Sequence, residues 1–296
     1  YYTGFKVNSG EYKLMGLAPY GKPRYVDKII NNLIDLKDDG TFILDQKYFN
    51  YSTGLTMTNE KFDNLFGNPP RKPEKEKITQ FHMDIASSIQ NVTEKIMLML
   101  ARSLKDEYKL SNLCLAGGVA LNCVANGKIL EEKIFDNIWV QPAAGDAGGS
   151  LGGALAYWHI DLKKERNNIA QDNMQGSYLG NYFEEKEIKE TLSEVGAEFT
   201  EMSEEDIIGK TALEISNGKA IGWFQGRMEF GPRALGNRSI LGDPRSDKMQ
   251  KNLNLKVKYR ESFRPFAPSI LREDLPEWFN INVDSPYMLL VADVSS

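Results

Sequence analysis

The sequence predicts an α/β fold with nucleotide-binding features, because two successive segments each read as a strand, a glycine turn and a helix. In the first segment, the apolar run at residues 113–115 ends at Gly117 and Gly118, and helical spacing of apolar residues follows. In the second, the stretches NIWVQP, AAGDAGGS and LGGALAYWHI repeat that order. Each turn is therefore expected at the end of a strand, where a helix begins.

A long amphipathic helix is predicted before these turns. Its apolar side chains recur every three or four residues, at Ile78, Phe81, Ile85, Ile89, Val92, Ile96, Leu100 and Leu104. We expect this helix to pack on a sheet. The apolar pattern lapses over residues 163–181, which predicts an interdomain connection. Beyond it, a helix that Gly218 ends and a buried strand over residues 219–226 are predicted.

Composition bounds the class of protein. The chain has 296 residues, 41% of them hydrophobic and 26% charged, which is typical of a soluble protein with two domains and excludes a membrane span. Cys114 and Cys123 are expected to be buried thiols, which indicates a reducing, cytoplasmic location. The chain begins with Tyr and ends on LLVADVSS without a closing element, so we expect it to be an interior piece of a longer protein.

Arginine gathers in one stretch, residues 226–245, which reads GRMEFGPRALGNRSILGDPR. Between Arg227 and Arg264 there are ten Lys and Arg residues against four Asp and Glu residues, whereas the whole chain has a net charge of -5. Guanidinium groups are suited to phosphate and carboxylate oxygens. A single basic segment in an acidic chain favours a small anionic ligand over nucleic acid, which needs a broad positive face.

The glycine turns are candidate nucleotide sites. Gly117 and Gly118 in the first turn, and Gly148 and Gly149 in the second, allow backbone to approach a phosphate at a helix N-terminus. Asn122 can add a side-chain hydrogen bond. The alternative is that these glycines only make tight turns.

Asp146 lies inside the second glycine turn and has two interpretations. Its carboxylate can cap the following helix, or it can bind a divalent metal through a hard oxygen. The sequence offers no convincing second ligand, since His82 and His159 are more simply explained as structural residues.

A second basic cluster, KVKYRESFRPFAPSIL, contains Lys258, Arg260 and Arg264. Strand alternation would place Lys258 and Arg260 on one side, where a solvated face is the simplest explanation. Arg264 differs because aromatic and proline residues surround it, so its guanidinium is expected to be partly desolvated and to need an anionic partner.

Five stretches together resemble the nodulation-protein-U type of O-carbamoyltransferase, and they span nearly the whole chain in order. They are EYKLMGLAPYGKP, LAGGVALNCVANGKI, QPAAGDAGGSLGGAL, FQGRMEFGPRALGNRSILGDPR and KYRESFRPFAPSIL. The resemblance implies part of an actin-like ATPase (Kae1-like) domain over residues 1–175, truncated at its N-terminus. Part of a YrdC-like α/β domain follows over residues 176–296, and it is expected to be truncated at its C-terminus.

The same resemblance implies an activity. The YrdC-like domain of such an enzyme forms carbamoyl adenylate from carbamoyl phosphate and ATP, and the Kae1-like domain passes the carbamoyl group to a hydroxyl of a small-molecule acceptor. No nucleic-acid or membrane partner is implied, and oligomer formation is left open. The alternatives are an actin-like sugar kinase or ATPase, and a non-catalytic nucleotide-binding module.

Residue roles follow from the resemblance as expectations. The phosphate and carbamoyl oxygens would be held by Arg233, Arg238, Lys258, Arg260 and Arg264, and the adenylate by Gly117, Gly118 and Asn122, with Gly148 and Gly149 in the second turn. Asp146 would bind the divalent metal, which the family suggests is iron, with Mg²⁺ as the alternative. The family's two metal-binding histidines are absent from this chain, so this piece alone is expected to have an incomplete site and doubtful activity.

Overall fold

The computed structural model describes residues 1–166 and 172–295, which belong to two compact units. The units interleave along the chain: unit 1 comprises residues 1–113, 122–139 and 263–265, and unit 2 comprises residues 114–121, 140–262 and those from 266 onward. The expected division at residue 175 stays a prediction. Part of the predicted connection, residues 167–171, lies outside the described residues.

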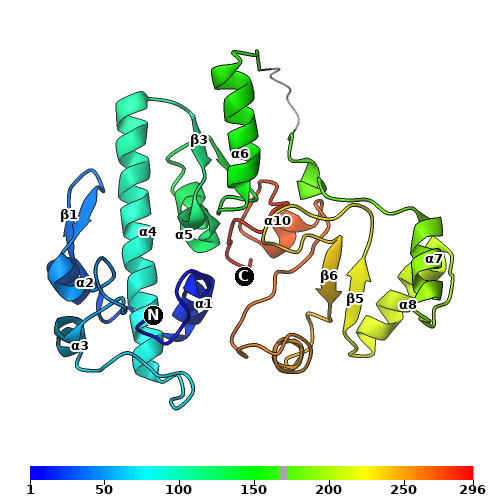
Figure 1. Ribbon diagram of the computed structural model, residues 1–296, viewed down its shortest axis with the longest axis horizontal. Helices are drawn as coiled ribbons and strands as arrows, with labels where there is room; N and C mark the ends of the chain where they lie inside the picture. The colour runs from blue at the N-terminus through cyan, green and yellow to red at the C-terminus, as the bar shows by residue number, and fades with distance from the viewer. Residues whose placement is uncertain (167–171, 296) are drawn as a thin grey trace. The chain divides into compact units, whose positions relative to one another are not determined.

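Unit 1 is mainly helical (Figure 1). Its elements in chain order are α1 (Glu11–Leu17), η1 (Ala18–Tyr20), α2 (Val26–Leu33), β1 (Ile34–Leu36), β2 (Phe42–Leu44), η2 (Gln46–Tyr48), α3 (Glu60–Phe66), α4 (Gln80–Tyr108) and α5 (Cys123–Glu131). Strands β1 and β2 pair antiparallel, with Asp35 opposite Ile43.

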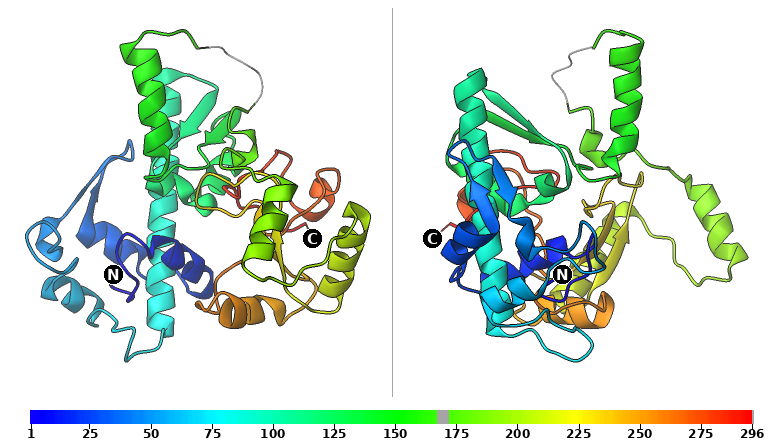
Figure 2. Two further views of the ribbon diagram at one scale, coloured as in Figure 1. Left: turned by 45° about the vertical axis from the view of Figure 1, so that its right-hand side comes forward. Right: turned by 60° about the vertical axis from the view of Figure 1, so that its left-hand side comes forward.

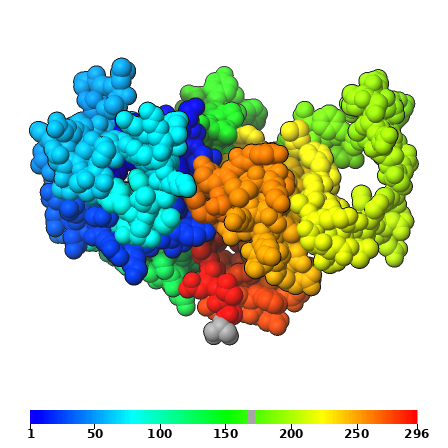
Figure 3. Space-filling view, turned by 90° about the horizontal axis from the view of Figure 1, so that it is seen from below, coloured from blue at the N-terminus to red at the C-terminus, as the bar shows by residue number. Residues whose placement is uncertain are grey.

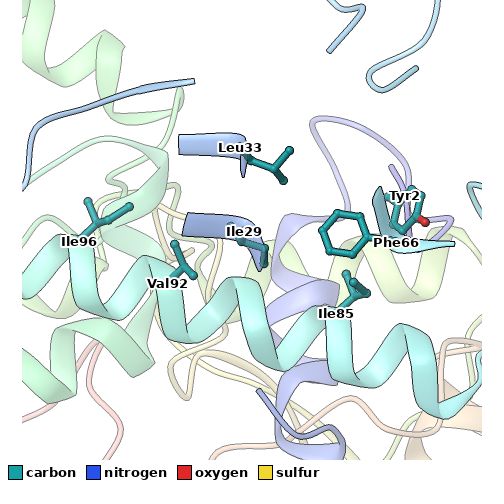
Figure 4. Packing of buried hydrophobic residues seen from close by; sticks show 7 residues of the cluster. All are labelled: Tyr2, Ile29, Leu33, Phe66, Ile85, Val92 and Ile96. Atoms are coloured by element: carbon teal, nitrogen blue, oxygen red, sulfur yellow. The ribbon is translucent and has the colours of Figure 1, made fainter. Parts of the chain in front are cut away.

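Helix α4 confirms the predicted amphipathic helix. A capping box between Thr79 and His82 begins it, and Lys109 ends it in the left-handed conformation. Its apolar stripe forms the centre of a core cluster (Figure 4), which consists of Tyr2, Ile29, Leu33, Phe66, Ile85, Val92 and Ile96. The expectation that α4 packs on a sheet is wrong in the main, because α4 packs chiefly on helical segments, namely η1, α5, α2 and α1. From strand β1, only Ile34 and Leu36 join the cluster.

The elements of unit 2 can be followed in Figures 1 and 2. They are η3 (Gly118–Leu121), α6 (Gly148–Ala156), η4 (Tyr157–Asp161), η5 (Gln175–Ser177), α7 (Glu185–Glu194), α8 (Glu204–Ser216), β5 (Ile221–Phe224), β6 (Arg238–Leu241), α9 (Met249–Asn252), η6 (Leu253–Val257) and α10 (Leu275–Trp278). Strands β5 and β6 pair antiparallel from Ile221 opposite Leu241 to Phe224 opposite Arg238.

Both predicted strand, turn and helix segments are present. Strand β3 (Asn112–Leu115) leads through the first glycine turn to α5, and β4 (Asn137–Val140) leads through the second to α6. The class is therefore mixed α/β as expected. Within the described residues the named strands pair only in twos, as β1 with β2, β3 with β4 and β5 with β6. No helix in that part of the chain is long and apolar enough to cross a membrane.

Two expectations about burial are wrong. Cys114 is exposed and Cys123 is only partly buried, because Cys114 points away from the face on which its neighbour Leu113 is buried. Strand β5 is half-exposed rather than buried: its residues alternate, and Phe224 keeps 57% of its surface accessible. Helix α8 ends where predicted, since Gly218 follows it in the left-handed conformation at φ +80°.

His82 gives unit 1 a predicted pH dependence. Burial lowers the pKa of His82, and the charge of Arg71 adds to the effect, so the neutral ring accepts the Thr79 N–H. The unfolded chain binds this proton more readily, so the contribution to stability is present above the unfolded pKa near 6.5 and is lost as pH falls below it. We expect the urea concentration at the midpoint of unfolding to be lower at pH 5.5 than at pH 7.5. The substitution His82→Gln is expected to make this difference smaller. His159→Gln is the control, and equal effects of both substitutions would contradict this assignment.

Candidate functional site

The first glycine turn contains two glycines of different kinds. The backbone conformation requires glycine at position 117 but not at position 118. Gly117 has φ +100°, a conformation that other residues adopt at a cost, and its N–H donates to Ala144 O at 2.8 Å. Gly118 has no positive φ, and a methyl group placed there would find no atom within 4 Å. Both residues are exposed. The turn geometry therefore explains Gly117, whereas at Gly118 it leaves an open approach to the backbone.

The second glycine turn shows the same contrast. A Cβ at Gly148 would lie 2.2 Å from Ala143 O, so the fold requires glycine there, while Gly149 faces open space. Asp146 is exposed, and helix α6 has no side-chain cap. The capping interpretation of Asp146 is therefore wrong, because α6 begins at Gly148 with Ala147 as its cap residue.

Strands β5 and β6 form a hairpin, with residues 225–237 as the connection between them. The arginine-rich stretch supplies nearly all of this connection, strand β6 and the residues up to Arg245. Two of its arginines are held by nearby acceptors. Arg227 donates to Gly180 O at 3.0 Å, and Arg245 binds both carboxylate oxygens of Asp243. The hydrogen bonds from the Arg245 side chain lower the pKa of Asp243 to about 2. These two guanidinium groups therefore stabilise turns.

Arg238 is also engaged within the hairpin. Its Nε donates to the buried Glu229 carboxylate at 2.9 Å, and its Nη2 donates to Gly231 O at 2.6 Å and to Arg233 O at 2.9 Å. The predicted role of Arg238 as a ligand contact stays a prediction. The geometry gives it a bracing function.

Arg233 is the arginine that connects the hairpin to the glycine turns of unit 2. Its Nη2 donates to Leu121 O at 3.2 Å, at the end of η3. Its Nε is buried and has no hydrogen-bond partner among the described residues. A buried donor without an acceptor is costly, and an anionic ligand would satisfy it.

The hairpin backbone approaches the second turn as well. A Cβ at Gly231, where φ is +124°, would lie 3.3 Å from Pro142 O. Since Gly117 N–H binds Ala144 O, three segments far apart in the sequence meet in unit 2: the two glycine turns and the arginine hairpin. This junction is the candidate site. The three segments that meet there carry Gly117, Gly118, Gly148, Gly149, Asp146, Arg233 and Arg238.

Lys258 and Arg260 do not lie on a strand, so the expected alternation is wrong. Residues 253–257 form the π-helical segment η6, and Lys258 is its cap residue. Arg260 donates from Nε to Asn254 Oδ1 at 2.6 Å and stacks on Phe266 with 4.8 Å between Cζ and the ring centre. The segment of α9 and η6 reaches the surface in the space-filling view (orange in Figure 3), although Met249, Leu253 and Asn254 within it are buried.

Asn122 and Arg264 belong to unit 1 and are described within it. The side chain of Asn122 caps α5 through the Ala125 N–H and forms a reciprocal amide pair with Gln90 at 3.1 Å. Arg264 is half-buried, with its Cζ 4.3 Å from the centre of the Tyr12 ring. Its predicted desolvation is thus confirmed in part, and an aromatic face supplies one contact.

The described residues do not by themselves fit a metal ion. No group of three His, Cys, Asp or Glu side chains within residues 1–166 and 172–295 is arranged to hold one. His82, on α4, caps its helix as expected of a structural histidine. Asp146 can supply one carboxylate, so a metal bound there needs further ligands that no cluster of the described His, Cys, Asp and Glu side chains provides.

Three residues near the predicted motifs escaped sequence reasoning. Glu229 is the acid that organises the hairpin, Tyr12 stacks on Arg264, and the buried Asp84 accepts hydrogen bonds from the Lys22 N–H and Gln80. Burial alone would raise the pKa of Asp84, but these hydrogen bonds and the charge of Arg24 outweigh it and lower the pKa. The sequence could have pointed to Glu229, because it is an isolated acid among the arginines that precede and follow it.

Comparison with known proteins finds two family models in chain order. The model described as the carbamoyltransferase N-terminus matches residues 1–155, and the model described as the carbamoyltransferase C-terminus matches residues 212–296. The first alone covers just over half of the chain, and together the two models match the regions that hold both glycine turns and the arginine hairpin.

Several proteins are similar over most of this chain. An uncharacterized protein of Synechocystis sp. is 62% identical over 99% of the chain, which covers 48% of that protein. Nodulation protein NolO of Bradyrhizobium diazoefficiens is 40% identical over 92% of the chain, covering 47% of that protein, and nodulation protein NolNO of Sinorhizobium fredii is 37% identical over 96%, covering 40%. The chain thus spans about half the length of the curated relatives it matches.

Proposed function

Because this chain belongs to the carbamoyltransferase family, we propose that the protein containing it is an ATP-dependent O-carbamoyltransferase. It forms carbamoyl adenylate from carbamoyl phosphate and ATP and transfers the carbamoyl group to a hydroxyl of a small-molecule acceptor in the cytoplasm. The observation that carries this proposal is the junction of the arginine hairpin with the two glycine turns in unit 2. There, the Arg233 guanidinium contacts Leu121 O and keeps a buried Nε without a partner among the described residues.

The proposed reaction balances in two steps. Carbamoyl phosphate loses its phosphate to water, and an oxygen of the resulting carbamate attacks the α-phosphorus of ATP while pyrophosphate leaves. The acceptor hydroxyl then attacks the carbonyl carbon, its proton passes to a base, and AMP leaves. Both steps gather negative charge on phosphoryl or carbamoyl oxygens, which preorganised guanidinium groups stabilise.

The residues of the chain divide this work. Arg233 supplies a directional, charge-assisted contact to phosphate or carbamoyl oxygens. Positive charge at the site, or support for the loops that bear the basic side chains, comes from Arg238, Lys258, Arg260 and Arg264. Gly118 and Gly149 leave backbone open to the adenylate, while Gly117 and Gly148 shape the turns. Asn122 orients the start of α5. We keep the Kae1-like and YrdC-like domain types as part of this proposal.

A metal enters the proposal only through Asp146. An iron or magnesium ion bound by its carboxylate and by ligands from outside this chain would supply Lewis-acid polarisation of a carbonyl. The described residues do not complete such a site, so no step of the reaction is assigned to it.

Asp146→Asn is expected to lower the metal content of the full-length protein severalfold, because a neutral amide replaces the charged oxygen ligand. The fold should persist, since Asp146 is exposed and does not cap α6. Metal content by atomic spectroscopy and the melting temperature are measured beside Asp136→Asn, an exposed aspartate before β4. An unchanged metal content would remove Asp146 as a ligand.

Pyrophosphate release by the full-length protein tests the proposed function. With ATP present, release is expected to depend on carbamoyl phosphate and to need no hydroxyl acceptor for the first turnover. Release of ADP on a sugar acceptor, without any need for carbamoyl phosphate, would instead support a kinase.

A further inference from the structure

Glu229 is a buried acid inside the most basic segment of the chain. Its side chain is 0% exposed, although the hairpin connection around it is largely at the surface. A buried carboxylate is costly unless charges and hydrogen bonds compensate it. The contacts of Glu229 within unit 2 therefore show which parts of the hairpin its carboxylate holds in place.

Each carboxylate oxygen of Glu229 has its own partners. Oε1 accepts the Leu235 N–H at 2.9 Å and the Asn237 N–H at 2.8 Å, and Oε2 accepts Arg238 Nε at 2.9 Å. The first pair closes the loop from residue 229 to residue 237. The second contact fixes the direction of the Arg238 guanidinium.

Arg238, held by Glu229, in turn holds the backbone around Arg233. Its Nη2 reaches the carbonyl groups of Gly231 and Arg233 at 2.6 and 2.9 Å. Both carbonyls flank the short Gly-Pro-Arg turn from which the Arg233 side chain leaves. One continuous path of charge-assisted hydrogen bonds thus runs from Glu229 through Arg238 to the backbone that carries Arg233.

We propose that Glu229 is a positioning residue that acts through Arg238 to set the direction of the Arg233 guanidinium toward its anionic ligand. The inference rests on the proposed function. A fold-stabilising acid alone would need only to close the loop, which the two backbone contacts achieve. The third contact, to an arginine whose other donors hold the backbone at Arg233, couples the acid to the candidate ligand contact.

Glu229→Gln separates these contributions. The amide oxygen can keep the two backbone N–H groups, but the amide nitrogen then faces Arg238 Nε, donor against donor. We expect kcat/KM for carbamoyl phosphate, in pyrophosphate release by the full-length protein, to fall about tenfold to a hundredfold. In an Arg233→Met background the same substitution should change kcat/KM by less than about threefold, because the residue through which it acts is gone.

The melting temperature is measured for the parent, for the two single variants Glu229→Gln and Arg233→Met, and for the double variant. A purely structural Glu229 would lower kcat/KM by the same factor in both backgrounds, in step with the melting temperature, and that result would overturn the positioning role. Should Glu229→Gln fail to fold, Arg238→Lys tests the same path, since an ammonium cannot span the carboxylate and both carbonyls. Glu132→Gln, which removes an exposed ion pair with Arg102, is the control.

Amide hydrogen exchange distinguishes failure of this inference from failure of the proposed function. Slow exchange at Leu235 and Asn237 in the parent, accelerated by Glu229→Ala, is expected whatever the reaction is. Rapid exchange at both amides in the parent would show that Glu229 does not hold the Leu235 and Asn237 N–H groups. A parent that releases no pyrophosphate with carbamoyl phosphate would remove the proposed function and, with it, this role of Glu229.

Discussion

Arg233→Lys in the full-length protein is expected to reduce carbamoyl-phosphate-dependent pyrophosphate release by roughly thirtyfold to a thousandfold, or about 2 to 4 kcal/mol of transition-state stabilisation. An ammonium keeps the charge but cannot reproduce the two-pronged guanidinium contact. In this structure one prong already binds Leu121 O, so the buried Nε is the donor that the ligand would use. Lysine would offer a single nitrogen for both tasks.

The matched control for this substitution is Arg102→Lys, at an exposed arginine of α4 that pairs with Glu132. Exposed ion pairs contribute ~1 kcal/mol or less, so its rate should stay within about threefold of the parent. The melting temperature should change little in either variant. Near-parent release by Arg233→Lys would remove the anion-site interpretation of the arginine stretch.

Gly118→Val is expected to abolish carbamoyl transfer to acceptor, with a loss of at least about a hundredfold, while carbamoyl-adenylate formation survives. The new side chain would occupy the open space where the adenylate must approach backbone. Because Gly118 has no positive φ and no neighbouring atom within 4 Å of a built Cβ, the fold should tolerate valine there.

Transfer is followed as carbamoylated acceptor and adenylate formation as pyrophosphate release, both with the full-length protein. Gly117→Ala serves as the structural contrast, because its φ of +100° should make that variant lose stability. Parent-like transfer by a folded Gly118→Val variant would show that the first turn does not receive the adenylate.

The features that the sequence predicted well are those that short patterns determine. The spacing of apolar residues defined α4, and the glycines after β3 and β4 marked the turns, because helix periodicity and turn conformation are local properties. Gly218 ended α8 for the same reason. The family resemblance added the carbamoyltransferase assignment, which both family models confirm.

The roles of individual polar side chains depended on partners that are distant in sequence. Arg233 finds Leu121 O across 112 positions, and Asn122 finds Gln90 across 32. Sequence spacing cannot show such partners, so it gave no sign that Glu229 and two carbonyl groups bind the Arg238 side chain. The role of Arg238 as a ligand contact, which the family resemblance implies, stays a prediction. Strand alternation was also expected at Lys258 and Arg260, but Lys258 caps the end of η6 and Arg260 follows it outside any strand.

Mass analysis of the acceptor tests the central claim most directly. Full-length protein is incubated with ATP, carbon-labelled carbamoyl phosphate and a panel of small hydroxyl compounds. We predict that one acceptor gains a single labelled carbamoyl group, with one AMP and one pyrophosphate formed for each group transferred. An acceptor that gains a phosphoryl group while ADP forms, or ATP that binds without any consumption of carbamoyl phosphate, would contradict the account.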